Sequence, residues 1–316
     1  MKFRTLAAIA ASAVLATATV AGPHATAAPF SRIVVFGTSL SDSGNAFALH
    51  GGANTPPDYL LDPLLVPSAP YARGGHHFSN GATWVEQFAR SNGLAGSVRP
   101  AFASASAASN YAVGGARARE DGSNLNLPQQ VDAFLLDNGG IAPSDALYVI
   151  EMGGNDVRDA LVAYGSGGAP IILHDAIVAI AQSIARLHGA GARTFLVWRV
   201  PNVGLTPAIR SLGAGAIQLG TGLSQAFNSG LDGALVPLGG LPGIRIARLD
   251  AYRLLGDLVA GGASFGLTNV TTPCVTPYVP PFTCGTPDEF LFWDGIHPSA
   301  AVHTIIAQEA ASVLVR

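Results

Sequence analysis

The sequence predicts an α/β protein, a three-layer α/β/α sandwich around a central, mainly parallel sheet of five strands. Short, continuous apolar runs alternate along the chain with longer amphipathic runs. This is the order expected of strands buried on both faces and of the helices that cover them. No internal repeat, charge run or Ser/Gly linker divides the chain beyond its first residues. We therefore expect a single domain over residues 28–316, although the length would allow two.

The apolar runs give the expected strands, which are residues 33–36, 109–113, 146–152, 194–200 and 244–249. The amphipathic runs give the expected helices, which are residues 84–90, 128–136, 174–188, 215–235 and 298–315. In open parallel sheets, ligands bind beyond the carboxyl ends of the strands. The polar residues that directly follow the expected strands are therefore the first candidates for a functional site.

The first 27 residues have the layout of a secretory signal peptide. Lys2 and Arg4 precede an apolar run from Leu6 to Val20, and the small residues Ala25-Thr26-Ala27 follow. We expect cleavage after Ala27 and a secreted protein, either extracellular or periplasmic. Beyond this leader no stretch of about 18 apolar residues runs without Gly, Pro or charge, so no integral membrane segment is expected after signal removal.

Charge and lysine content exclude several classes of function. The 17 basic and 20 acidic residues give a net charge of −3, which becomes −5 when Lys2 and Arg4 leave with the leader. Nucleic acid is therefore not an expected partner. Lys2 is the only lysine in the chain. This excludes a lysine nucleophile, a Schiff base and a P-loop lysine in the mature protein.

Two cysteines, Cys274 and Cys284, lie in a Pro-rich segment. In an exported chain we expect them to form a disulfide that closes a short loop. Two unpaired buried thiols are the alternative. A metal site is not expected here, because no histidine or second cysteine pair lies nearby at ligand spacing.

A serine follows the first expected strand in the sequence Gly37-Thr38-Ser39. Gly37 permits a sharp turn, which would present Ser39 as a nucleophile at the carboxyl edge of the sheet. Taken alone, Ser39 could equally be an ordinary turn or capping residue.

Hydrogen-bond donors follow the second and third expected strands. A pair of glycines, Gly114-Gly115, can expose a backbone N–H, and Asn155 follows a second pair, Gly153-Gly154. An amide side chain and a free backbone N–H can both donate to a developing oxyanion. Each segment alone is also a normal turn sequence.

Near the carboxyl end, Asp294 and His297 are separated by two residues. One tight turn can aim the carboxylate at a ring N–H of His297, which leaves the other ring nitrogen as a base toward a serine. An Asp-x-x-His segment can instead be a structural cap. The combination favours an active site, because the serine, the donors and the Asp/His pair all fall at expected loops on one sheet edge.

Together these segments resemble the sequence blocks of the SGNH, or GDSL, hydrolase superfamily, in its secreted lipase, phospholipase and esterase branch. The resemblance spans nearly all of the chain after the leader and includes residues 78–81 and 201–207. It implies an SGNH, flavodoxin-like fold. It also implies that Ser39 is the nucleophile and His297 the base, oriented by Asp294.

The resemblance further implies an oxyanion hole. Its donors are the backbone N–H of Ser39, that of Gly115 and the side chain of Asn155, with Gly114 as the alternative glycine. One position departs from the family, which usually has aspartate where this chain has Thr38. Thr38 can still take part in a hydrogen bond of the loop. The sequence leaves open how firmly the turn that carries Ser39 is held.

The sequence thus predicts a secreted serine carboxylester hydrolase, an esterase or lipase that acts through an acyl-serine on lipid or small acyl esters without a cofactor. Three alternatives are an acyltransferase that passes the acyl group to an alcohol, an esterase for carbohydrate esters, and a non-catalytic secreted binding protein. Arg117 and Arg119 could meet an anionic head group or lie in solvent as surface arginines.

Overall fold

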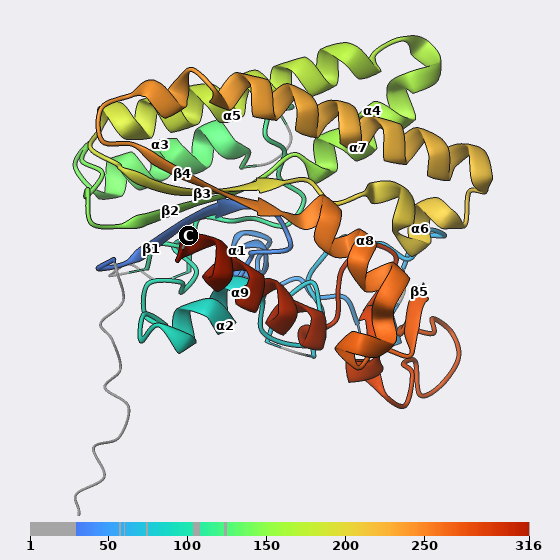
Figure 1. Cartoon of the computed structure of the whole chain (residues 1–316). Coiled ribbons are helices and arrows are strands. Elements are labelled where there is room, and N and C mark those ends of the chain that lie inside the picture. Colours follow the sequence, from blue (N-terminus) through green and yellow to red (C-terminus); the bar gives the residue numbers. More distant parts are fainter. Residues whose placement is uncertain are drawn as a thin grey trace, which may run out of the picture.

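The structure is a computed structural model and describes residues 30–56, 58–59, 61–73, 75–103, 108–122 and 125–315. The expected signal peptide, residues 1–27, lies outside the described residues. Figure 1 shows a sheet with one layer of helices on each side. This confirms the predicted α/β class and the parallel central sheet.

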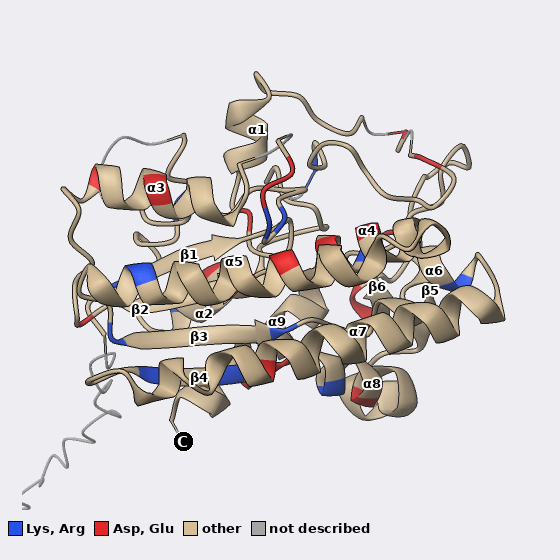
Figure 2. Cartoon of the chain, turned by 90° about the horizontal axis from the view of Figure 1, so that it is seen from above, with Lys and Arg blue, Asp and Glu red and all other residues tan. Residues whose placement is uncertain are grey.

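Four strands form the central sheet, and all of them are parallel. They are β1 (Ile33–Gly37), β2 (Leu147–Glu151), β3 (Thr194–Arg199) and β4 (Arg245–Asp250), and they pair in the order β1-β2-β3-β4. Figure 2 shows them side by side in this order under a largely uncharged layer of helices. Because parallel strands share a direction, their carboxyl ends all meet at one edge of the sheet.

The prediction of a fifth strand over residues 109–113 is wrong. This segment runs beside β1 and makes one bridge, between Val35 and Asn110. The next pairing along β1 would need the N–H of Gly37, which instead donates to Oε1 of Gln130 at 2.9 Å. Because a buried side chain takes the bond, the ladder ends after one step and the segment continues as a loop.

The two layers of helices bury opposite sides of the strands. Helices α3 (Leu127–Asp137), α4 (Gly154–Ala163), α5 (Ala169–Gly189) and α7 (Ala214–Leu235) cover one face, and α2 (Trp84–Ser91), α8 (Ala251–Gly261) and α9 (Ala300–Leu314) cover the other (Figure 1). Successive side chains of a strand point to opposite faces. Val34 and Phe36 accordingly join the first core, and Ile33 and Val35 the second.

Shorter elements complete the chain. They are α1 (Asn45–Leu49), α6 (Pro207–Arg210), the 3₁₀ turns Tyr164–Ser166, Val203–Leu205, Leu238–Gly240, Gly262–Phe265 and Pro287–Glu289, and a two-stranded parallel sheet of β5 (Asn269–Pro273) and β6 (Phe290–Phe292).

Several helices begin at side chains that cap their free N–H groups. A capping box of Thr83 and Glu86 starts α2, and Ser299 caps α9. The cap at Ser299 fixes the start of α9 directly after His297. The expected helices correspond to α2, α3, α5, α7 and α9, whereas α4 and α8 were not expected.

Helix α5 is long and apolar enough to cross a membrane, judged by length and composition alone. It is the one such helix in the described part of the chain, and a stretch of 18 of its residues has a mean hydropathy of 1.4. In this fold it packs against α3, α4 and α7. Its residues Ile180, Ile184 and Leu187 are buried in the first core.

Cys274 and Cys284 form the expected disulfide, with their Cα atoms 4.9 Å apart. The bridge closes the loop that follows β5. Cys274 packs with Tyr59, Tyr71 and Trp293 in a small third core, and its N–H donates to the carbonyl of Trp293 at 3.1 Å. The disulfide loop is therefore bonded to the residue that precedes Asp294.

Candidate active site

Ser39 lies two residues beyond the last residue of β1, at the carboxyl edge of the sheet. Its side chain is nearly buried, with 8% of the residue exposed. The turn that carries it is closed by the N–H of Ser41, which donates to the carbonyl of Thr38 at 3.1 Å. The serine is thus presented by a short, hydrogen-bonded turn, as the sequence predicts.

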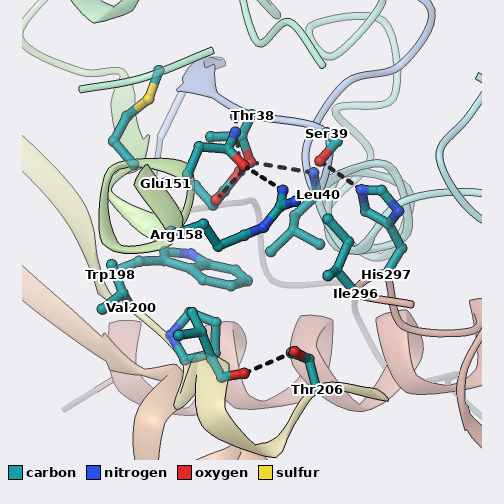
Figure 3. Close-up of a pocket in the computed structure, with 15 residues that line it drawn as sticks. Thr38, Ser39, Leu40, Glu151, Arg158, Trp198, Val200, Thr206, Ile296 and His297 are labelled. Carbon is teal, nitrogen blue, oxygen red and sulfur yellow. Dashed lines mark hydrogen bonds between the residues drawn. The ribbon is translucent and has the colours of Figure 1, made fainter. Parts of the chain in front are cut away.

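His297 joins Ser39 to Asp294. Its Nε2 atom lies 2.8 Å from Oγ of Ser39, and its Nδ1 atom lies 2.7 Å from Oδ2 of Asp294. The imidazole and its carboxylate partner are both withdrawn from water, since His297 is 2% exposed and Asp294 is 0% exposed. Figure 3 shows the His297 ring facing the Ser39 hydroxyl. The structure therefore brings all three predicted side chains into one hydrogen-bonded chain.

The Asp294 carboxylate is held by four donors. Its Oδ1 atom accepts the backbone N–H groups of Ile296 at 2.9 Å and His297 at 2.7 Å, which closes the tight turn. Its Oδ2 atom accepts the hydroxyl of Tyr71 at 2.8 Å in addition to the imidazole. Burial and the nearby negative charge of Asp294 raise the pKa of Tyr71 well above its ordinary value, so Tyr71 stays a donor.

The two candidate glycines differ in what their N–H groups do. The N–H of Gly114 donates to Oδ2 of Asp42 at 2.8 Å, whereas that of Gly115 meets no acceptor among the described residues. Gly114 also needs to be glycine, because a Cβ there would lie 2.2 Å from the ring of Phe78. The free donor is thus Gly115. It lies two residues beyond Val113, whose N–H donates to the carbonyl of Gly37 at 3.1 Å.

Asn155 stands in the first turn of α4, directly after the end of β2. Gly153, the residue that precedes the helix, has a φ of 108°, a conformation that side chains disfavour. Asn155 Nδ2 donates one hydrogen to the carbonyl of Ala116 at 2.8 Å. This bond fixes the amide and leaves a second N–H on the same nitrogen.

A cavity opens in front of these groups. Ser39, His297 and Asn155 line it together with apolar side chains, among them Trp198 and Ile296. In the part of the chain that the structure describes, no cluster of three or more His, Cys, Asp or Glu side chains is placed to hold a metal ion.

Comparison with known families assigns the chain to the family that its sequence blocks resemble. The GDSL-like Lipase/Acylhydrolase family model matches residues 33–310, which is most of the chain. The protein belongs to this family. The resemblance predicted from the sequence blocks is therefore confirmed.

Three curated relatives illustrate the range of similarity. A GDSL esterase/lipase of Arabidopsis thaliana is 27% identical, with 88% of this chain and 84% of the relative aligned. Thermolabile hemolysin of Vibrio parahaemolyticus is 24% identical over 88% of this chain and 62% of the relative. Esterase EstA of Pseudomonas aeruginosa is 29% identical over 92% of this chain and 48% of the relative. The chain thus spans only about half of EstA.

At the position where GDSL hydrolases usually have aspartate, Thr38 contacts a carboxyl group that comes from another strand. Its hydroxyl donates to both Oε atoms of Glu151 at 3.0 Å, and its backbone N–H donates to Oε2 at 2.9 Å. The Ser41 hydroxyl donates to the same Oε2 atom at 3.1 Å. Burial raises the pKa of Glu151 to about 7, and the bonds from Thr38 and Ser41 oppose this shift. The nucleophile turn is therefore tied to the end of β2.

The interpretation of Arg117 and Arg119 as solvated surface arginines is wrong. Neither is a free surface arginine, because Arg117 pairs with Asp159 at 3.0 Å, and Arg119 pairs with Asp156 at 2.8 Å and with Asp159 at 2.8 Å. These carboxylates offset the charge of both guanidinium groups. The bonds instead tie the loop after Gly115 to α4.

Sequence reasoning missed three residues of this site. Tyr71 contacts Asp294, Glu151 holds the nucleophile turn, and Arg158 lines the cavity one helical turn after Asn155. The Nη1 atom of Arg158 lies 3.5 Å from Oδ1 of Asn155. A sequence signal exists for Glu151, which is a carboxylate inside the otherwise apolar strand Leu147–Glu151. The sequence signal for Arg158 is its position three residues after Asn155, which places both side chains on the same face of a helix.

Proposed function

We propose that this protein hydrolyses carboxylic esters through an acyl-enzyme formed on Ser39. The observation that carries the proposal is the pair of contacts made by His297, at 2.8 Å to Ser39 and 2.7 Å to Asp294. An imidazole bonded on one side to a buried carboxylate and on the other to a serine hydroxyl is the arrangement that activates a serine. The matched family and its esterase and lipase members support the same reaction.

In the first half of the reaction, Nε2 of His297 takes the proton of Ser39 as Oγ attacks the ester carbonyl. Asp294 keeps the imidazole in the required tautomer and stabilises its positive charge. The backbone N–H groups of Ser39 and Gly115 and the second N–H of Asn155 stabilise the oxyanion. His297 then returns the proton to the leaving alcohol.

In the second half, water replaces the alcohol. His297 removes a proton from this water, which attacks the acyl-serine carbonyl, and the same donors hold the second tetrahedral intermediate. Collapse of that intermediate releases the carboxylic acid and restores the Ser39 hydroxyl. The chain's own side chains supply every proton transfer in this sequence.

We further propose that the protein is exported and forms one domain over residues 28–316. The signal-like leader favours export. The disulfide between Cys274 and Cys284 agrees with an oxidising compartment. Both helical layers pack on one sheet, which favours a single domain.

Replacement of the nucleophile tests the proposed reaction. We expect Ser39→Ala to lower kcat/KM on p-nitrophenyl acetate by about 10⁶-fold, the loss typical of a serine removed from such a triad. The exposed Ser91→Ala is the matched control and should keep the wild-type rate. A fluorophosphonate should label the wild type and the control but not Ser39→Ala. Wild-type turnover by Ser39→Ala would refute the proposal, and formation of a new ester when an acceptor alcohol is added would identify an acyltransferase instead.

A further inference from the structure

We propose that Arg158 binds a negatively charged group of the substrate, which makes the protein selective for esters that carry such a charge near the bond that is cleaved. This inference rests on the function proposed for Ser39 and adds a substrate class to it. Its basis is a guanidinium group in the wall of the active-site cavity that has no carboxylate partner among the described residues.

Helix α4 places Arg158 beside the proposed oxyanion hole. Arg158 follows Asn155 by three positions, so both side chains leave the same face of the helix. The Nη1 atom of Arg158 lies 3.5 Å from Oδ1 of Asn155. Arg158 also lines the cavity together with Ser39 and His297, and Figure 3 draws these three side chains around it. A group bound to the guanidinium therefore shares the cavity with the reacting ester.

Most of the donors of Arg158 are unused. The contact with Asn155 is the only hydrogen bond of the Arg158 side chain in the part of the chain that the structure describes. It is long for a hydrogen bond and occupies one N–H group of a guanidinium that has several. Arg117 and Arg119 differ in this respect, because both are bonded to Asp159. Arg158 thus keeps most of its N–H groups for a ligand.

The carboxylates around Arg158 are committed to other groups. Asp159 accepts both arginines of the preceding loop, and Asp294 is held by four donors. Asp62 is exposed and accepts two backbone N–H groups of its own loop at 2.9 Å. Glu151, on the wall of the cavity, accepts the donors of the nucleophile turn. Within the described residues, none of these carboxylates forms an ion pair with Arg158.

The surroundings of Arg158 disfavour an unpaired cation. Burial and the positive charge of Arg117 lower the pKa of Arg158 from its ordinary value. An arginine still keeps its proton in a protein, so the charge is held in a wall with apolar side chains such as Trp198 and Ile296. Opposite charges attract more strongly there than in water. A carboxylate or phosphate group of the substrate can accept two parallel N–H bonds and offset the cost of this charge.

The oxyanion of the reaction fits this charge less well than a permanent anion does. Arg158 contacts Oδ1 of Asn155, whereas Nδ2 is the proposed donor to the oxyanion. The guanidinium therefore approaches the amide at the end that does not serve the oxyanion. In the proposed mechanism the oxyanion already has three donors, and a neutral ester has no other negative charge. A permanent charge elsewhere on the substrate is the partner that the position of Arg158 fits.

The test uses two pairs of esters in which methylation removes the charge. The acyl-side pair is the mono-p-nitrophenyl ester of adipic acid and the methyl ester of that compound. The alcohol-side pair is p-acetoxybenzoate and its methyl ester. We expect the wild type to prefer the charged member of one pair in kcat/KM. The pair that shows this preference identifies whether the charge belongs to the acid or to the alcohol of the ester.

Substitution of Arg158 should remove this preference. We expect Arg158→Gln to lower the ratio of kcat/KM for the charged over the neutral member by about tenfold or more, because a charge-assisted bond is lost. Arg158→Lys keeps the charge without the paired donors and should retain part of the preference. Each ratio is measured within one preparation, so a lower folded fraction cancels from it. Arg90→Gln, at an exposed arginine of α2, is the matched control and should keep the wild-type ratio.

The outcomes separate this inference from the proposed function. No hydrolysis of p-nitrophenyl acetate by the wild type would overturn the function proposed for Ser39. Hydrolysis with a preference for the neutral member of both pairs would overturn only the anion site. A ratio of charged to neutral ester that Arg158→Gln leaves unchanged would also overturn it, because Arg158 would then act through Asn155 and not on a charge of the substrate.

Discussion

The hydroxyl of Tyr71 donates to Oδ2 of Asp294 at 2.8 Å, the same oxygen that accepts Nδ1 of His297 at 2.7 Å. The carboxylate that orients the proposed base is thus itself oriented by a residue 223 positions earlier in the chain. Tyr71 is 0% exposed and packs edge-on against Trp293, with ring centroids 5.7 Å apart. Its position is therefore fixed by packing as well as by the bond.

We expect Tyr71→Phe to lower kcat by roughly tenfold and to leave KM nearly unchanged, because a bond to a charged group is lost beside the base and not in the substrate cavity. Tyr111→Phe is the matched control, since the Tyr111 hydroxyl donates to Asp137 at 2.8 Å outside the site. Steady-state kinetics on p-nitrophenyl butyrate measures both constants. A change of KM alone would contradict a positioning role for Tyr71.

Removal of the Asn155 amide should mainly affect the transition state. We expect Asn155→Ala to lower kcat by about 10²- to 10³-fold, the usual loss for one oxyanion donor, with a much smaller change in KM. Asn155 also donates to Ala116, so a thermal unfolding curve should accompany the kinetics. A loss of kcat that follows the fraction unfolded at the assay temperature would assign Asn155 to stability instead.

Glu151 should make the free energy of unfolding depend on pH. Its pKa is raised from 4.5 to about 7 in the folded protein, so the folded state binds this proton more tightly than the unfolded state. The stabilising contribution of protonated Glu151 is fully present below pH 4.5, and it is lost as the pH rises through about 7. The shift corresponds to roughly 3 kcal/mol.

Urea unfolding of wild type and Glu151→Gln at several pH values between 4.5 and 8 measures this effect. Other titrating groups are common to both proteins, so they cancel in the difference between the two free energies of unfolding. We expect wild type to lose about 3 kcal/mol relative to Glu151→Gln across this range. A difference that stays constant with pH would show that Glu151 does not titrate there.

The carboxyl group at the nucleophile turn should work from either of two positions, residue 151 at the end of β2 or residue 38 just after β1. Thr38→Asp alone places a second buried carboxyl beside Glu151, so we expect it to lower the free energy of unfolding by about 2 kcal/mol or more. The double variant with Glu151→Thr restores one carboxyl and one hydroxyl, and it should recover most of this loss. Additive effects of the two substitutions in urea unfolding would contradict the exchange.

Much of the fold and site could be predicted because its signals are local. The Asp294-x-x-His297 spacing fits one tight turn, and polar residues follow the apolar strands within a few positions. Helix α4 was missed because its first residues, Gly153 and Gly154, are typical of a turn. Its start depends on Gly153 at a φ of 108°, with its Cα packed so that a Cβ would lie 2.3 Å from Phe227. That contact joins segments far apart in the chain.

The errors have the same origin. The segment at 109–113 has the apolar pattern of a strand, and only the side chain of Gln130, which takes the N–H of Gly37, prevents the ladder from continuing. Arg117 and Arg119 are neutralised by Asp156 and Asp159 across a loop and a helix. Partners of this kind depend on the packed fold and leave no periodic signal in the sequence.

The contact between Ser39 and His297 joins positions 258 residues apart. No partly synthesised chain that ends before residue 297 holds both groups, so the proposed chemistry is absent until the last helix has docked. An unfolded polypeptide would therefore lack the proposed activity. Activity recovered after refolding consequently reports that the two ends of the chain have been joined.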